Sequence, residues 1–276
     1  MTELTFLRVL LLIALLVAPF ATRPSLPRSR WDLPAQGVAF LCSAIGLFSS
    51  IPMLTGAWLL YCIGSGLRYA VHRHKTLFSL STIAQGVPFV FSVVAAGWLV
   101  GGACDLRILG YGPAYSFYAS LHGNVLGWIM LGGVALLAGQ EDQHRRLHLA
   151  TVFVSLASFF LIAFGIDQLP ALKPLGVLGV SIMLPLSQLS FLRRTRHRRV
   201  AFGLALVSLL GLALTLAFAW LNELSRLPSI YLLGARSMVS VHGVLNAVVV
   251  GPAWLGAVYL SRIQDRALEL PQREGE

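Results

Sequence analysis

Long apolar stretches alternate with short polar connections along the whole chain of 276 residues. A helix needs about 17–25 predominantly apolar residues to cross the hydrocarbon core of a bilayer. Stretches of about that length occupy residues 5–21, 35–50, 52–68, 84–103, 114–138, 149–167, 173–192, 200–221 and 236–260. The pattern predicts an all-α, polytopic bundle of about nine transmembrane helices. It forms a single integral-membrane domain over residues 1–276, with a short polar tail at 261–276.

The division between the second and third stretches depends on Pro52. Proline removes a backbone hydrogen-bond donor and favours either a helix break or a first helical turn. Pro52 follows Ser49 and Ser50 in the middle of residues 35–68. Two short helices are therefore expected there. A single long helix over 35–68, which would leave eight spans, is the alternative.

The first apolar stretch has the length of a secretory signal, but its flanks differ from those of a signal. The leader MTEL carries an acidic residue rather than a basic one, and no small-residue cleavage pattern precedes Arg23. We therefore expect this stretch to be a retained helix.

The distribution of charged residues predicts how the bundle is oriented in the membrane. Charged residues make up only 12% of the chain, against about 25% in average soluble domains, and the mean hydropathy is +0.76. A net charge of +10 would suggest nucleic-acid binding in a soluble protein, but lysine and arginine concentrate in the cytoplasmic loops of membrane proteins. Nine spans place 16 of the 21 lysines and arginines on one side and 5 on the other, whereas eight spans give 13 and 8. The sequence thus predicts nine spans in the bacterial cytoplasmic membrane, N-terminus outside and C-terminus inside, with no nucleic-acid partner.

The densest basic run lies between the seventh and eighth predicted spans. It contains Arg193, Arg194, Arg196, Arg198 and Arg199. Basic clusters at the inner membrane face attract anionic lipid head groups. We expect the lipid bilayer to be the partner of this chain and its anionic head groups to contact these arginines. The sequence gives no indication of an oligomeric state.

The histidines fall into two groups. Five neighbour basic residues on the predicted inner side and are expected to be solvated at the interface: His72, His74, His144, His148 and His197. His122 and His242 lie instead within predicted spans. Ionisable groups are costly inside a membrane and are therefore candidates for function.

His122 and His242 are expected at similar depths, because both lie near the outer ends of spans predicted to run inward. At a rise of about 1.5 Å per residue, each lies roughly 9–12 Å below the outer surface. Each is followed by a glycine, which lets a neighbouring helix approach closely. Asn246 shares a helix face with His242, and Tyr118 precedes His122 by four residues. With Asn124, these residues are the candidate substrate-binding site or pathway in the outer half of the bundle.

Three interpretations of the histidine pair stay open. Histidines that hydrogen-bond neighbouring helices would indicate a structural or assembly protein. Histidines that line a path for a small solute, an ion or a proton would indicate a transporter, which is our first hypothesis. Histidines that ligate haem or a metal ion would indicate a redox or sensor protein, but no third ligand with suitable spacing lies within the spans. We expect no cofactor. No nucleophilic triad, phosphate loop or dinucleotide motif is present, so neither a catalytic residue nor an enzyme is predicted.

Two short motifs carry a resemblance to a known family. In the first, residues 91–139 contain an apolar helix with a tryptophan, a Leu-Gly-aromatic turn and a helix that opens with a histidine. The matching residues are Trp98, Leu109, Gly110, Tyr111, His122, Gly127 and Trp128. The second motif, His-Gly-x-x-Asn-Ala, is matched in full by His242, Gly243, Asn246 and Ala247. Both motifs, in this order, resemble the YndJ-like family of bacterial membrane proteins.

The resemblance implies an integral-membrane fold and, at most, a transporter by analogy. The sequence departs from the family at four positions of the first motif. In the turn, Tyr111 replaces a phenylalanine. Asn124 replaces a second histidine, and Val125 and Leu126 replace a Tyr-Ala pair. Because asparagine is a poor ligand for haem or metal ions, its presence weakens the haem or metal interpretation of His122 and His242.

Overall fold

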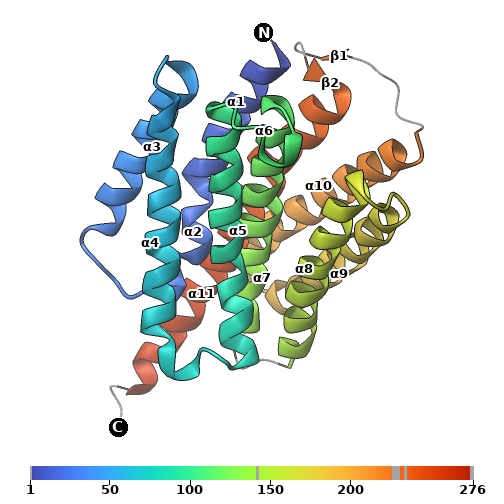
Figure 1. Cartoon of the computed structure of the whole chain (residues 1–276). Coiled ribbons are helices and arrows are strands. Elements are labelled where there is room, and N and C mark those ends of the chain that lie inside the picture. Colours follow the sequence, from blue (N-terminus) through green and yellow to red (C-terminus); the bar gives the residue numbers. More distant parts are fainter. Residues whose placement is uncertain (1, 141–142, 226–230, 233–234, 274–276) are drawn as a thin grey trace.

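The computed structural model describes residues 2–140, 143–225, 231–232 and 235–273, and helices that run side by side fill most of this part (Figure 1). The first elements are α1 (Glu3–Val17), α2 (Pro19–Thr22), η1 (Arg23–Ser25), α3 (Asp32–Phe48), η2 (Pro52–Thr55), α4 (Gly56–His72), η3 (His74–Thr76), α5 (Leu80–Ala103) and η4 (Ile108–Gly110). They are followed by α6 (Pro113–His122), η5 (Gly123–Met130), α7 (Leu131–Ala138), α8 (Arg145–Asp167), α9 (Leu172–Thr195) and α10 (Arg199–Glu223). The last elements are β1 (Tyr231–Leu232), β2 (Ala235–Arg236), η6 (Met238–Gly243), η7 (Leu245–Val250) and α11 (Gly251–Arg273).

Each of the nine predicted stretches falls on a helical segment of the described chain. Seven segments are long and apolar enough to cross a membrane: Glu3–Ser25, Leu80–Ala103, Pro113–Ala138, Arg145–Ile166, Leu172–Thr195, Arg199–Glu223 and Met238–Asp265. The other two, α3 and α4, have 17 residues each. The all-α membrane fold is confirmed. The number of spans and their orientation stay predictions. Arg226, one of the five basic residues predicted on the outer side of the membrane, is not among the described residues.

The break at Pro52 is confirmed, and the alternative of one helix over 35–68 is wrong. Helix α3 ends at Phe48, Pro52 opens the 3₁₀ turn η2, and α4 begins at Gly56. The turn folds tightly against the end of α3, because a Cβ on Gly46 would lie only 2.9 Å from the backbone nitrogen of Thr55. Proline and glycine thus allow α4 to return alongside α3.

The two shorter helices also present apolar faces to the outside of the bundle. Large exposed side chains on α3 include Val38, Leu41 and Ile45, and those on α4 include Leu60 and Leu67. Contiguous exposed apolar surface of this kind is typical of contact with lipid. Both helices are therefore expected to lie in the bilayer with the longer ones.

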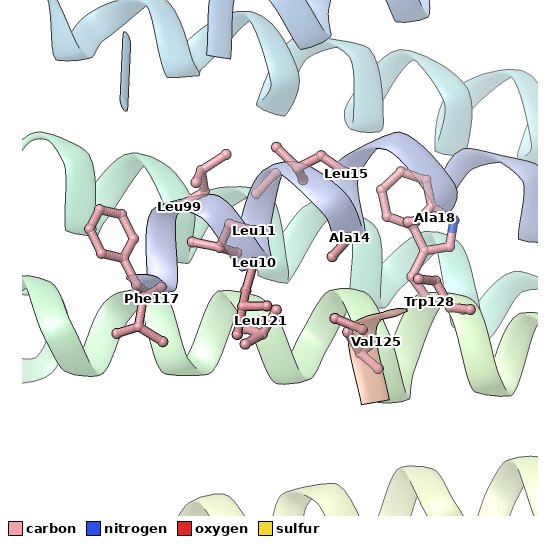
Figure 2. Packing of buried hydrophobic residues seen from close by; sticks show 14 of the residues in the cluster. Leu10, Leu11, Ala14, Leu15, Ala18, Leu99, Phe117, Leu121, Val125 and Trp128 are labelled. Carbon is pink, nitrogen blue, oxygen red and sulfur yellow. The ribbon is translucent and has the colours of Figure 1, made fainter. Parts of the chain in front are cut away.

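The segment α6–η5–α7 lies at the centre of the bundle. In its most apolar stretch of 18 residues, 89% of the residues are buried, whereas in the corresponding stretch of α8 only 28% are. Helix α1 packs directly against it, and Leu10 and Ala14 of α1 lie on the side toward Leu121 and Val125 within one apolar cluster (Figure 2). A helix that supplies part of the core favours the prediction that the first stretch is retained.

Three segments have π-helical hydrogen bonding, which the sequence pattern did not predict. One is η5, and the others are η6 and η7, which precede α11. In a π-helix the backbone N–H bonds five residues back instead of four, and such turns occur frequently at functional sites. The described chain has these turns in the two helices that carry His122 and His242.

The predicted polar tail at 261–276 begins as a continuation of the last helix. Helix α11 runs to Arg273, and residues 274–276 lie outside the described residues. Asp265 of this extension pairs with Arg198 at 2.5 Å and with Arg194 at 3.4 Å. Arg198 also donates to the carbonyl oxygen of Ser261 at 2.6 Å. Two of the five arginines expected at lipid head groups therefore bond within the protein.

His148 is not the solvated side chain that its basic neighbours suggested. It is only 2% exposed, and its Nδ1 lies 2.9 Å from the hydroxyl oxygen of Ser187 on α9. His148 is three residues past Arg145, the first residue of α8, and faces the neighbouring helix. The sequence prediction failed here because proximity to basic residues along the chain does not determine which way a helical side chain faces.

Candidate functional site

A cavity of about 310 Å³ lies between the two helices that carry the intramembrane histidines and the helices α8, α9 and α10. His122, His242 and Asn246 supply polar groups to its lining, whereas most of the wall is apolar, as at Leu126 and Leu216. Ligand sites in proteins commonly combine an apolar wall with a few convergent polar groups. The cavity is therefore the candidate site.

The structure brings His122 and His242 together across this cavity. Their ring centroids are 6.2 Å apart, with 30° between the ring planes. The glycine after each histidine contributes to the close fit. A Cβ on Gly123 would lie 2.8 Å from Cβ of Ala95, and one on Gly243 would lie 3.0 Å from Leu10. The close approach of another helix backbone is confirmed at Gly123, whereas Gly243 contacts the end of the Leu10 side chain.

Backbone carbonyls fix the orientation of both imidazoles. His122 Nδ1 lies 2.9 Å from the carbonyl oxygen of Tyr118, one helical turn earlier. His242 Nδ1 lies 3.0 Å from the carbonyl oxygen of Thr215 on α10. Because a carbonyl oxygen can only accept a hydrogen bond, the proton of each neutral ring resides on Nδ1. Each Nε2 then keeps a lone pair that can accept a hydrogen bond or bind a cation.

An ion pair that the sequence analysis missed lies at one end of the cavity. Lys173 Nζ and Glu223 Oε2 are 2.6 Å apart, and both residues line the cavity. Lys173 is the second residue of α9 and Glu223 is the last of α10. The pair therefore marks the end of the cavity that faces away from Arg194 and Arg198. A signal existed in the sequence, because both residues lie at the same predicted side of adjacent spans.

Tyr118 lies outside the cavity lining and belongs to a separate polar cluster. Its hydroxyl donates to the Glu3 carboxylate at the start of α1. Arg236 lies 3.4 Å from both Tyr118 Oη and Glu3 Oε1, and its backbone nitrogen donates to Glu3 Oε2 at 3.2 Å. The hydrogen bond that Arg236 donates to the Tyr118 hydroxyl oxygen and the charge of Glu3 raise the pKa of the Arg236 guanidinium. Tyr118 thus contributes to the site through its carbonyl group, which orients His122, and its side chain joins α1 to α6.

Asn124 also faces away from the cavity. It is fully buried, and its amide nitrogen donates to the carbonyl oxygen of Ser120 at 2.9 Å on its own helix. Its Oδ1 has no hydrogen-bond partner among the described residues. Of the five candidate residues from the sequence, three therefore line the cavity and two lie outside it.

The described residues contain no group of three or more His, Cys, Asp or Glu side chains arranged to hold a metal ion. A metal ion held between His122 and His242 would therefore need further ligands of another kind.

The comparisons with known proteins identify a family. A search of curated proteins and a search of solved structures each find no significant match. The model of the YndJ-like protein family matches residues 7–250, which include both histidine motifs. The chain belongs to the YndJ-like family.

Proposed function

We propose that this chain is a transporter of the bacterial cytoplasmic membrane that carries a small solute or ion, with His122, His242 and Asn246 as the polar part of its binding site. The proposal rests on one observation. Two imidazoles from distant parts of the sequence lie 6.2 Å apart on one cavity of about 310 Å³. That volume is at the lower end of the range of about 300–1,000 Å³ found for small-molecule sites.

The orientation of the imidazoles supports a ligand site over a purely structural role. A histidine that serves only to join helices needs no accessible nitrogen. Here one nitrogen of each ring bonds to the backbone, and His122 remains accessible in the bundle because it lines the cavity. The remaining nitrogens offer two hydrogen-bond acceptors to whatever enters.

The same groups define the chemistry of the solute. Two neighbouring acceptors suit a molecule with a hydroxyl or amino donor, and the apolar wall suits a short hydrocarbon body. Two imidazolium charges at this separation would repel each other strongly in an apolar cavity. The site is therefore expected to bind its solute with at least one neutral histidine.

The predicted orientation places the site in the outer half of the bundle. Lys173 and Glu223, at the end of the cavity away from the arginine-rich helix ends, would then face the outside. The first step of transport in this proposal is entry from that end.

The test starts from the purified full-length protein in lipid nanodiscs. Its melting temperature is measured against a panel of primary alcohols, amines and weak acids small enough for the cavity. We expect at least one compound to raise the melting temperature. His122→Phe and His242→Phe, which keep a ring and remove the acceptor, should abolish that rise. A radiolabelled form of the same compound should be taken up by proteoliposomes that contain the unchanged protein.

His148→Phe is the matched control, because His148 is a buried histidine that does not line the cavity. It should leave the compound's effect intact. Stabilisation that persists in both cavity variants would refute the site. Binding without uptake would refute transport and leave a binding or sensor protein.

The orientation of the two rings also favours a second candidate, a metal-binding protein. Histidines that ligate metal ions commonly donate their other ring N–H to a backbone carbonyl, as both do here. The candidate predicts that purified protein retains a transition metal by mass spectrometry of the elements. The metal should be lost in His122→Ala and His242→Ala and kept in His148→Ala. Equal metal content in all three variants would eliminate it.

A further inference from the structure

A second group of buried polar side chains lies between the cavity and the arginine-rich helix ends. It consists of His148 and Thr151 on α8, Ser187 and Gln188 on α9, and Ser208 on α10, and we refer to it as the α8–α10 polar cluster. Each of these five side chains is at most 2% exposed. None of them lines the cavity. The cluster is therefore a separate feature from the candidate site.

Hydrogen bonds connect the cluster across three helices. His148 Nδ1 lies 2.9 Å from Ser187 Oγ. Gln188, the next residue on α9, donates to Ser208 Oγ at 3.1 Å, and Ser208 donates to the carbonyl oxygen of Val250 at 2.9 Å. No bond among the described residues joins the side chains of Ser187 and Gln188, so these are two separate hydrogen-bonded groups on adjacent residues of α9. Together they extend from one turn inside the start of α8 to the π-helical segment η7.

Several buried acceptors in and beside the cluster are unpartnered. Gln188 Oε1 accepts no hydrogen bond from any described residue, although its side chain is fully buried. The hydroxyl oxygens of Ser155 and Ser190, one on each side of the cluster, are likewise buried without a partner in the described chain. Buried polar atoms of this kind usually bond to internal water, and such sites need several polar groups around them.

Only a thin apolar layer separates the cluster from the cavity. Val180 and Leu212 line the cavity. Leu184, fully buried, is one turn from Val180 and one turn from Gln188, and Leu212 is one turn from Ser208. One helical turn corresponds to about 5.4 Å. Apolar constrictions as thin as this close pathways in membrane proteins by excluding water.

Helix association alone accounts less well for these residues. Polar side chains that join membrane helices are satisfied by one another across the interface. Here the bonds among the described residues leave Gln188 Oε1 without a partner.

We propose that the α8–α10 polar cluster binds water and forms a hydrophilic passage from the arginine-rich helix ends to the floor of the cavity, closed by Leu184 and Leu212. The binding of water stands on the cluster alone. The role as a passage rests on the proposed function of the cavity. With the passage, the cavity has one end at Lys173 and Glu223 and a second, closed connection to the opposite face.

Accessibility of engineered thiols to aqueous Ag⁺ tests the proposal. The three native cysteines, Cys42, Cys62 and Cys104, are replaced by alanine in the full chain in proteoliposomes. Ser187→Cys and Ser208→Cys are then compared with Leu186→Cys and Val207→Cys. Each control is the neighbouring residue at the same depth, but its native side chain is exposed on the apolar outside of the bundle. After exposure to Ag⁺ the protein is denatured, and thiols that Ag⁺ has not blocked are labelled with a maleimide. The loss of labelling therefore measures how fast Ag⁺ reached each thiol.

We expect Ag⁺ to block the cluster thiols at least tenfold faster than the lipid-facing thiols. Equal, slow rates at all four positions would overturn the proposal. This result is independent of the cavity experiments, because it requires neither a solute nor the histidines His122 and His242.

A measurement on the unchanged chain covers the case in which a cysteine variant does not fold. Hydroxyl radicals generated by an X-ray pulse oxidise side chains next to bound water. Leu184 and Leu99 are both fully buried leucines, but only Leu184 adjoins the cluster. Oxidation of Leu184 at least several-fold above that of Leu99 is expected, and equal oxidation of the two would contradict water in the cluster.

Discussion

Gly127 gives the sharpest test of how closely the central helix is packed. It lies in the π-helical segment η5, and a Cβ there would be 2.2 Å from Cδ1 and Cγ of Phe91. Ordinary contact begins near 3.4 Å, so Gly127→Ala would require a shift of about 1.2 Å (3.4 − 2.2). The ring of Phe91 is itself held edge-on against Phe159, with centroids 4.7 Å apart at 85°. The ring therefore has little freedom to move away.

The expected loss of stability follows from two opposing effects. Inserting a methyl group into a filled core costs about 1–3 kcal/mol. Replacing glycine by alanine inside a helix returns at most about 1 kcal/mol. The 2.2 Å separation from Phe91 puts this position at the upper end of the insertion cost, so Gly127→Ala should lower the free energy of unfolding by about 2 kcal/mol. Gly203→Ala on α10 is the matched control, because nothing lies within 4 Å of a Cβ at that position, and it should be neutral or stabilising.

The assay is reversible unfolding in mixed micelles with increasing SDS, followed by tryptophan fluorescence. A double-mutant cycle with Phe91→Ala isolates the contact. In that background Gly127→Ala should lose its penalty, with a coupling energy of about 1–3 kcal/mol. The reasoning fails if Gly127→Ala is as benign as Gly203→Ala, or if its penalty is unchanged when Phe91 is truncated.

Three further substitutions follow from the site geometry. Asn124→Leu should change stability by less than about 1 kcal/mol, because it removes an amide that bonds only within its own helix. The same variant should bind the solute as the unchanged protein does. A loss of solute binding would show that Asn124 belongs to the site. Lys173→Met should lower stability by about 2 kcal/mol, because it leaves the half-buried Glu223 carboxylate without its partner. Adding Glu223→Gln to this variant should restore most of the loss. Equal melting temperatures for the single and the double variant would contradict this. Glu3→Gln should cost at most about 1 kcal/mol, since Arg236 is 57% exposed, and an effect that does not shrink in high salt would show that the contact is not electrostatic.

Much of the fold could be predicted because its determinants are local. The length of each apolar stretch determines where a helix can span a membrane, and Pro52 marks the break between α3 and α4 without reference to any distant residue. The glycine after His122 correctly indicated a close contact with the backbone of another helix. Properties that depend only on neighbours along the chain were therefore accessible from the sequence.

The residues of the candidate site could be identified from the sequence only in part. Asn124 lies two residues after His122, which is about 200° around an α-helix, so this spacing already placed it on the opposite face. The motif resemblance grouped the two residues by position in the chain and not by helix face. The burial of His148 and the π-helical turns depend on neighbouring helices, and no pattern within a single segment reports them.

The position of α1 has a consequence for the order in which the protein is assembled. Helix α1 packs against the central segment α6–η5–α7, and Glu3 bonds to Arg236, 233 residues later in the chain. During synthesis α1 therefore lacks this partner until the segment that carries Arg236 has been made. Contacts of such long sequence separation form slowly and leave intermediates exposed. The pairing of α1 with the segment that carries Arg236 is thus expected to be a late step in folding.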